Sequence, residues 1–309
     1  MIIFDIVNIL SFDVGGTSIK YGIVNAQSEV IFKKSVPTPK DETNFLETVN
    51  EIISSNENSF DKISIAMPGF VNKKESCYTY GANLKYSIDF KKINSFDSSK
   101  FSIDNDGNVA AFSEFLLHYS TKFSNLIMLT FGTGIGGGII SDGKLLRGSG
   151  SAGEIGHMLS SSSIKEYKCN CGKKGCFEAS TSAAVWTKEC QRLSKKYPQS
   201  DLAKKFSEDK LGSILFDKTI KLNSEEEETR NEIITNISNG LVSLFEIFDN
   251  EAFVLGGSMS EKPYDLVDLI IEDVTNRFNF PSRIFPAILV STQRGEAGIV
   301  GAALIAQNE

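Results

Sequence analysis

Two segments of this chain have the same unusual order, an apolar strand, a glycine turn and a second apolar strand. In the first, Ile9–Val14 and Ile19–Val24 flank the turn Gly15–Ser18, which predicts a β-hairpin. In the second, the apolar run Asn125–Phe131 leads into the glycine-rich stretch Gly132–Gly138. The repeated pattern also hints at an internal duplication.

The first glycine turn has the chemistry of an anion-binding loop. Gly15 and Gly16 allow backbone N–H groups to approach a phosphate closely, and Thr17 adds a hydroxyl donor. Asp13, at the end of the first strand, could hold a hydrated Mg²⁺ beside that phosphate. The alternative is an ordinary Gly-Gly hairpin turn. The segment is not a P-loop, because it lacks the final Gly-Lys-Ser/Thr.

The second glycine stretch contains the spacing of a dinucleotide-binding motif. Gly132, Gly134 and Gly137 match GxGxxG, and Glu154 follows about twenty residues further on. That motif requires a helix after its last glycine, whereas the sequence from 138 to 143 indicates a strand and a turn. We therefore interpret the stretch as a second phosphate-binding hairpin.

The polar segment Asp104–Asn108 lies between a strand-like run and an apolar helix that starts at Val109. We expect it to be a loop. Its two carboxylates and two amides could place a general base beside hydrogen-bonding groups for a polyhydroxylated substrate. The alternative is an Asx-rich turn that caps the helix, which is the commoner reason for such a segment when it stands alone.

Three closely spaced cysteines predict a zinc knuckle. With the preceding His157 they form a Cys₃His set, which suits tetrahedral Zn²⁺. Four protein ligands leave no open position, so the metal is expected to be structural. Three buried free thiols are the alternative, and they would be odd in a loop so rich in lysine. The cysteine ligands are Cys169, Cys171 and Cys176.

Length, composition and charge limit the number of domains, the partners and the cellular compartment that we expect. At 309 residues the chain exceeds the size of a single core, so two domains are expected. The net charge of −7 gives no basic footprint and argues against nucleic acid as a partner. No apolar run reaches the roughly 18 residues that span a bilayer, and residues 1–8 make a poor signal peptide. We therefore expect a cytoplasmic protein without a membrane partner. In that reducing compartment, closely spaced cysteines indicate metal binding and not disulfides.

Two later segments add to the organisation. The strand-like run Ala252–Leu255 ends at Gly256 and Gly257, a junction that suits the adenosine part of a nucleotide, although many helix–strand turns look the same. Ser224–Glu227 has the pattern of a capping box at the start of a long helix.

Five motifs together resemble the ROK family of bacterial sugar kinases and repressors, over a range from about Ile9 to the C-terminus. The resemblance implies an α/β, actin-like ATPase (ribonuclease H-like) fold with two α/β domains closing on a cleft. We expect one domain to comprise 1–118 plus 292–309 and the other, with the knuckle, 119–291. The motifs are Asp13-Val-Gly-Gly-Thr17, Asp104-Asn-Asp-Gly-Asn108, Gly132-Thr-Gly-Ile-Gly-Gly-Gly138, Gly153-Glu-Ile-Gly-His157 and Cys169-x-Cys171-x₄-Cys176-x-Glu178.

The resemblance also implies roles. Asp106 resembles the catalytic base that takes the proton from a sugar 6-hydroxyl. The implied contacts of ATP and Mg²⁺ are Asp13, Gly15, Gly16, Thr17, Lys20, Thr133, Gly134, Gly256 and Gly257. The implied contacts of a hexose are Gly69, Asn83, Asn105, Asp106, Glu154, His157 and Glu178. The implied ligands of structural Zn²⁺ are His157, Cys169, Cys171 and Cys176.

The expected activity is ATP-dependent phosphorylation of a hexose, with glucose favoured and N-acetylmannosamine or a β-glucoside possible. Three departures from the family pattern leave the sugar open: Ala82 for a frequent proline, Tyr86 near a common tryptophan, and Gly107 for the usual alanine. A sugar-responsive repressor is one alternative, but it predicts a DNA-binding segment of several dozen residues where twelve precede Asp13. A non-catalytic sugar sensor is the other. A homodimer is the family expectation.

Overall fold

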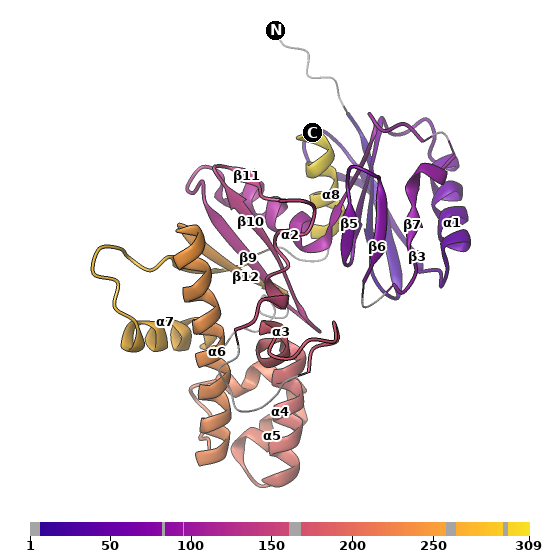
Figure 1. The fold of residues 1–309 in the computed structure, drawn as a ribbon. Coiled ribbons are helices and arrows are strands. Elements are labelled where there is room, and N and C mark those ends of the chain that lie inside the picture. The colour runs from indigo at the N-terminus through magenta and orange to yellow at the C-terminus, as the bar shows by residue number, and fades with distance from the viewer. Residues whose placement is uncertain (1–6, 82–83, 95, 161–167, 258–263, 293–295) are drawn as a thin grey trace.

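The computed structural model describes residues 7–309 except 82–83, 95, 161–167, 258–263 and 293–295. Within these ranges the chain forms two five-stranded sheets and one three-stranded sheet. Figure 1 shows two lobes, each built on one of the larger sheets, with most of the helices gathered below the second.

The first sheet has the order β3-β2-β1-β4-β8. The predicted hairpin is confirmed, since β1 and β2 pair antiparallel from Ile9↔Val24 to Val14↔Ile19. β4 then lies parallel to β1, and β8 parallel to β4. The strands are β1 Ile9–Val14, β2 Ser18–Val24, β3 Val30–Pro37, β4 Lys62–Met67 and β8 Phe101–Asn105.

Helices cover both faces of this sheet. Side chains of successive strand residues point to opposite faces, and Leu10 packs in the cluster that contains Phe45 of α1 (Glu42–Ser54). Its neighbour Ile9 packs with Ile299 and other residues of α8 (Ala297–Gln307). The small third sheet completes this lobe, and its strands are β5 Phe70–Asn72, β6 Cys77–Tyr80 and β7 Ile88–Asp89, followed by η1 Phe90–Lys92.

The second sheet repeats the plan of the first. Its order is β11-β10-β9-β12-β13, with an antiparallel hairpin β9–β10 followed by parallel β12 and β13. A strand therefore follows the glycine turn, which confirms that this stretch is a hairpin and not a dinucleotide motif. The strands are β9 Leu126–Phe131, β10 Ile135–Ser141, β11 Lys144–Leu145, β12 Ala252–Gly257 and β13 Ala287–Val290.

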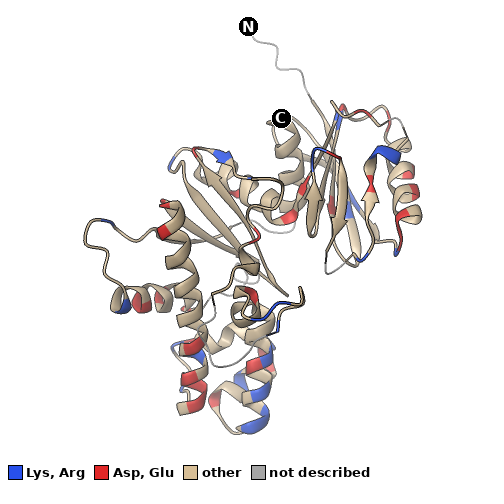
Figure 2. Ribbon diagram, in the orientation of Figure 1, with Lys and Arg blue, Asp and Glu red and all other residues tan. Residues whose placement is uncertain are grey.

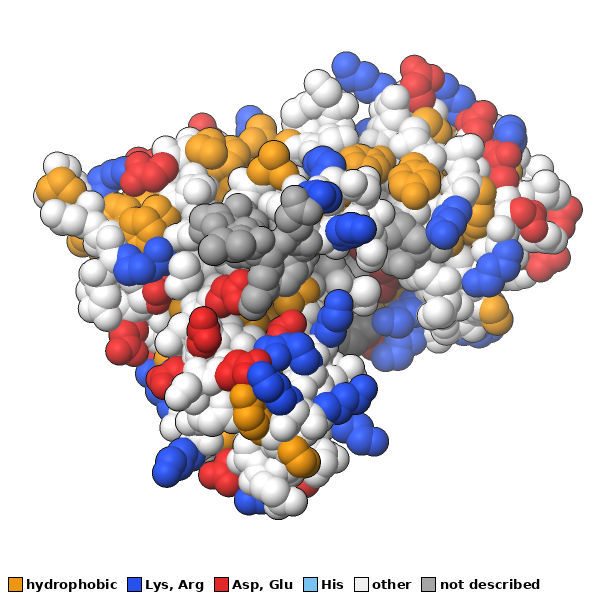
Figure 3. All heavy atoms as spheres, turned by 60° about the horizontal axis from the view of Figure 1, so that its bottom comes forward, with side chains coloured by type: hydrophobic (Ala, Val, Ile, Leu, Met, Phe, Trp, Pro, Cys, Tyr) orange, Lys and Arg blue, Asp and Glu red, His pale blue; other side chains and the backbone are white. Residues whose placement is uncertain are grey.

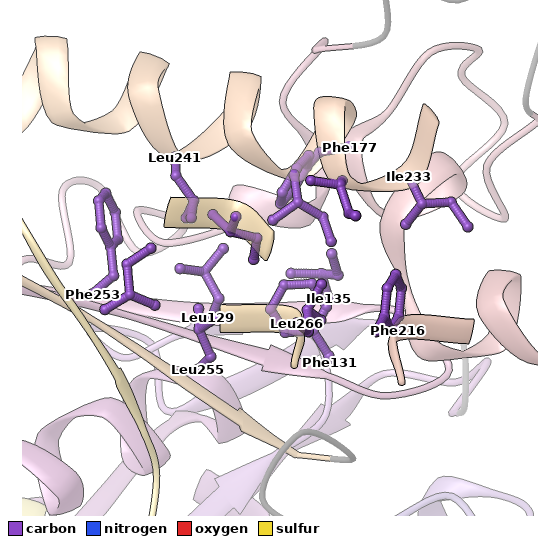
Figure 4. Close-up of a cluster of buried hydrophobic side chains, with 14 of the residues drawn as sticks. Leu129, Phe131, Ile135, Phe177, Phe216, Ile233, Leu241, Phe253, Leu255 and Leu266 are labelled. Carbon is purple, nitrogen blue, oxygen red and sulfur yellow. The ribbon is translucent and has the colours of Figure 1, made fainter. Parts of the chain in front are cut away.

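The core of the second lobe lies between this sheet and the long helix α6 (Ser224–Phe248). Figure 4 shows Leu241 of α6 above Leu129 and Phe253 of the sheet, and Ile233 of α6 above Phe216. Each fully buried side chain of this size contributes roughly 1.5–3 kcal/mol relative to exposure. The other helices of this lobe are η3 Ile155–His157, α3 Phe177–Thr181, α4 Ala183–Lys196, α5 Asp201–Asp209, η4 Gly212–Phe216 and α7 Leu266–Arg277.

The capping box of α6 begins one residue earlier than its sequence pattern predicts. Asn223, not Ser224, is the N-cap, and its side chain accepts hydrogen bonds from the backbone N–H groups of Glu225 and Glu226. The Glu226 carboxylate accepts the Asn223 N–H in return. An asparagine oxygen reaches these donors as well as a serine hydroxyl does, so the pattern alone did not fix the start.

Helix α2 (Asp106–Glu114) lies between the two sheets, packs on α8 and on β10, and continues as the π-helical turn η2 Phe115–Tyr119. Helix α8 follows the second sheet in the chain but packs on β1 and β4 of the first. The domain division at 118/119 and 291/292 stays a prediction.

Charged side chains are frequent on α4, α5 and the first turns of α6, whereas the strands of the second large sheet carry few (Figure 2). The face turned toward the viewer in Figure 3 mixes acidic and basic side chains. Among the described helices, none combines the length and apolarity that a bilayer crossing requires.

Candidate active site

Asp106 begins α2 directly at the end of β8, so the predicted loop Asp104–Asn108 is wrong as backbone structure. Strand β8 runs through Asn105, which is also the N-cap of the helix. The Asn105 side-chain oxygen accepts the N–H of Gly107 (2.8 Å) and that of Asn108 (3.2 Å). The alternative prediction, a segment that caps the helix, therefore describes the backbone. The cap at Asn105 places Asp106 at the first helical position, between the two sheets.

Asp106 has an unusual electrostatic environment. Burial at the junction of the lobes raises the pKa of Asp106 to about 7, with further increases from the negative charges of Asp13 and Glu154 and a partial offset from the Gly107 N–H. The residue itself is exposed to solvent, as a base that must reach a substrate requires. The carboxylates of Asp13 and Glu154 thus both act on Asp106 at this junction.

The first hairpin presents Asp13 and its turn beside α8. Asp13 Oδ2 lies 3.9 Å from Lys20 Nζ, and burial raises the pKa of the Asp13 carboxyl while Lys20 lowers it. A Cβ added to Gly298 would lie 2.3 Å from the Asp13 Cγ, so the carboxylate packs against the first turn of the helix. In the turn, the Gly15 N–H donates to the Ser18 carbonyl oxygen. The carbonyl oxygen of Gly15 accepts a hydrogen bond from the Thr38 hydroxyl (2.7 Å).

The remaining turn positions lie at the surface: Gly16 is half-buried and Thr17 is exposed. Both are therefore accessible to an anion, and the hairpin geometry is one that a phosphate could use. Whether a nucleotide binds here stays a prediction.

The second hairpin divides into two parts with different roles. Its turn is closed by the Gly132 N–H to Gly134 carbonyl bond of 2.9 Å, and Thr133 is exposed at the tip. The glycines that follow lie under α2: a Cβ on Gly138 would be 2.4 Å from the Ala111 Cβ. These glycines permit close packing between helix and strand, so only the turn can be proposed as a phosphate element.

Gly107 explains one departure of this chain from the family pattern. A Cβ at Gly107 would lie 2.7 Å from the carbonyl oxygen of Gly137, because α2 rests directly on β10. Alanine would not fit without a backbone shift. Gly107 is therefore a packing requirement here.

Gly256 and Gly257 end β12 beside the second turn. They pair with Thr130 and Phe131 of β9, and Gly257 has a φ of 70°. A Cβ there would also lie 2.5 Å from the Phe131 carbonyl oxygen. The close approach requires glycine at this end of the strand.

The implied sugar contacts fall in two connected groups. Asn105 donates its side-chain N–H to the Gly69 carbonyl (2.9 Å), which joins β8 to the turn after β4. Across the junction, His157 Nε2 lies 3.9 Å from a Glu154 carboxylate oxygen, and burial raises the pKa of Glu154. Asn83 lies outside the described residues.

Glu178, on α3, links the second hairpin to the knuckle. One carboxylate oxygen accepts the Ile135 N–H at 3.2 Å, and the other lies 2.8 Å from Cys169 Sγ and 3.8 Å from His157 Nδ1. The side chain is thus oriented from two sides. A carboxylate held in this way can accept hydrogen bonds from hydroxyl groups.

The four predicted zinc ligands come together, with all ligand atoms within 4.8 Å of one another. Cys171 Sγ lies 3.6 Å from Cys176 Sγ, and Cys169 Sγ lies 3.7 Å from His157 Nδ1. Tetrahedral Zn²⁺ with bonds of about 2.3 Å to sulfur places thiolates at about this separation. The donor set therefore fits structural zinc, and the metal would hold His157 beside Glu154.

Sequence patterns missed two residues near these positions, Lys188 and Arg147. A cavity of about 380 Å³ opens beside Thr133 and continues toward the knuckle as a second of about 430 Å³; neither is lined by Asp106. Lys188 of α4 lines both cavities. The other missed residue is Arg147, whose Nε lies 2.6 Å from the Asp104 carboxylate. Single basic residues in polar segments carry no signal without the fold.

Two similar sheets, each with a leading hairpin and each covered by helices, define an actin-like ATPase fold, as expected. A model of the ROK family matches residues 9–309. The chain belongs to the ROK family.

Several characterised relatives are sugar kinases. The chain is 27% identical to a glucokinase of Halalkalibacterium halodurans, over 96% of this chain and 94% of that protein. It is 27% identical to a beta-glucoside kinase of Listeria monocytogenes, over 95% of each. It is 29% identical to an N-acetylmannosamine kinase of Vibrio cholerae, over 88% of this chain and 92% of that protein.

Solved structures agree on the fold. A ROK family glucokinase from Streptomyces griseus in complex with glucose and AMPPNP superposes with a TM-score of 0.77 at 24% identity, over 98% of this chain and 100% of that chain. The ROK hexokinase from Thermus thermophilus gives 0.76 at 25% identity, over 97% and 98%. Family membership and these relatives support a sugar kinase.

Proposed function

We propose that this protein is an ATP-dependent hexose kinase that phosphorylates the 6-hydroxyl of its sugar. The observation that carries the proposal is Asp106, a carboxylate with a pKa of about 7 at a helix N-terminus between two glycine-turn hairpins. A general base is most effective when its pKa lies near the operating pH. Asp106 meets that condition because of where the fold puts it.

In the proposed reaction the oxygen of the sugar hydroxyl attacks the terminal phosphorus of ATP. Asp106 accepts the proton that this hydroxyl loses. A phosphorus–oxygen bond forms, the bond to the bridging oxygen breaks, and ADP leaves with that electron pair. The two turns would donate backbone N–H groups of Gly16–Thr17 and Thr133–Gly134 to the phosphates, because the N–H groups of Gly15 and Gly132 already bond within their turns. Asp13 offers the oxygen ligand that Mg²⁺ prefers, and the ion would neutralise charge on the phosphates.

The sugar would be held by groups that read hydroxyls. Asn105 and Gly69 contribute from the first lobe, and Glu154, His157 and Glu178 from the second. Zinc in the knuckle would orient His157 and, through Cys169, the neighbouring Glu178. Glucose is the favoured substrate; the similarity to an N-acetylmannosamine kinase and a beta-glucoside kinase makes those sugars the alternatives.

The test is ADP release with MgATP over a panel of glucose, N-acetylmannosamine and a β-glucoside. Turnover of glucose above the other two is expected, with kcat/KM falling as the pH drops through about 7, because the base is lost on protonation. Preference for another sugar would correct the substrate and keep the reaction. No turnover of any of the three would overturn the proposal.

A further inference from the structure

A buried carboxylate next to the proposed base has a separate set of partners. Asp104 is 5% exposed. One carboxylate oxygen accepts the backbone N–H of Asn105 (2.9 Å) and a side-chain N–H of Asn108 (2.8 Å). It therefore bonds to both sides of the strand–helix junction at which Asp106 lies.

The other oxygen of Asp104 reaches across to the second lobe. It lies 2.6 Å from Nε of Arg147, which follows β11 of the second sheet. A carboxylate this buried is costly without a counter-charge. Arg147 supplies that charge, and a hydrogen bond of this kind between ions is short and directional.

The main chain of Arg147 acts on the other side of the site. Its carbonyl oxygen accepts the N–H groups of Gly150 (2.8 Å) and Ala152 (3.2 Å), which closes the turn that leads to Glu154. One residue is thus connected to two segments: its side chain to the segment of Asp106, and its carbonyl to the segment of Glu154.

A third contact fixes the outer edge of the guanidinium. Arg147 Nη2 lies 2.9 Å from a Glu309 carboxylate oxygen, and the other Glu309 oxygen accepts the Ser102 hydroxyl at 2.6 Å. Lys73 also pairs with Glu309. The outer contact can be removed without touching the pair with Asp104, which provides a matched control.

We infer that Arg147 is a positioning residue, which holds the start of α2 through Asp104 so that Asp106 and Glu154 face the same substrate. This rests on the proposed sugar kinase function for its catalytic consequence. Arg147 itself is not assigned a contact with either substrate. Its effect is expected on turnover more than on binding, because a displaced base slows the reaction even where the sugar still binds.

The test compares Arg147→Ala, Arg147→Lys and Glu309→Gln with the unchanged chain, using whichever panel sugar it phosphorylates fastest. Arg147→Ala should lower kcat roughly 10- to 100-fold while KM for the sugar changes much less. Arg147→Lys should recover part of the loss, and guanidinium ion added to Arg147→Ala should recover some activity where sodium does not. Glu309→Gln should stay close to the unchanged chain.

Hydrogen exchange gives a readout that does not depend on turnover. Peptides covering 104–108 should exchange faster in Arg147→Ala than in Glu309→Gln, without a matching change across β1 and β2. If the unchanged chain phosphorylates no panel sugar, the proposed function fails and this exchange result alone decides the positioning role. Activity of Arg147→Ala within twofold of the unchanged chain, or exchange at 104–108 equal in both variants, would overturn the inference.

Discussion

At the scale of single residues, the same surroundings that suit Asp106 for proton transfer act against stability. Its pKa in the folded chain, about 7, lies above the ordinary value of 3.8. Between those values the folded state binds more protons than the unfolded state, so stability falls as pH rises through this window. The contribution is fully favourable only below about pH 4, and its loss is complete above pH 7.

Asp106→Asn should therefore separate activity from stability. Without the base, turnover should fall about 10²- to 10⁴-fold, while sugar binding persists. The variant should also gain stability relative to the unchanged chain at pH 8 but not at pH 4. Steady-state kinetics, calorimetric sugar titration and thermal unfolding at both pH values measure these effects. Turnover within tenfold of the unchanged chain would remove Asp106 as the base.

At the scale of elements, the contact between α2 and β10 depends on glycines that resemble a phosphate motif. Gly138→Ala should destabilise the chain by about 1–3 kcal/mol, because its Cβ would meet Ala111 and a backbone that cannot move freely. Gly132→Ala is the matched control, since nothing lies within 4 Å of an added Cβ there. Urea unfolding of both variants measures the difference. Equal stability of the two would show that the glycines do not act through packing.

The knuckle is a second element whose role can be isolated. The purified chain should contain about one Zn²⁺. Removal of the metal by a chelator should lower the unfolding temperature and weaken sugar binding, because His157 and Glu178 would lose their orientation. Metal analysis and sugar titration before and after chelation test this. Cys171→Ser should behave like the chelated protein and Cys77→Ser like the intact one; retention of zinc by Cys171→Ser would contradict the ligand set.

At the scale of the whole molecule, the chain crosses to the second lobe and returns through α8 to complete the first. Ala303, fully buried, packs with Ile9 and Val24 of β1 and β2. Ala303→Asp should destabilise the protein by more than about 3 kcal/mol, because it buries a charge without a partner. Asn308→Asp, at an exposed position, is the control. Thermal unfolding of both decides; similar unfolding temperatures would mean that α8 is not part of this core.

Local patterns predicted much of this architecture, and their failures have a common cause. Apolar runs and glycine turns located both hairpins, and the cysteine spacing located the knuckle. The segment Asp104–Asn108 was expected to be a loop because its composition is that of a turn, yet a strand and a helix meet there without one. The sequence alone predicts phosphate binding for the glycines at 136–138, because nothing in the sequence of β10 indicates that this strand packs against α2.

The sequence by itself determined the order of strands and turns, the proposed metal ligand set and the residues of each motif, because these depend on neighbours a few positions apart. Only the tertiary structure decided that Asp13 and Glu154 raise the pKa of Asp106, and that Asp104 pairs with Arg147. Burial and distance set the strength of a charge interaction, and both arise from packing between segments far apart in the chain. The motifs indicated the proposed chemistry, and the fold set the pKa of the proposed base.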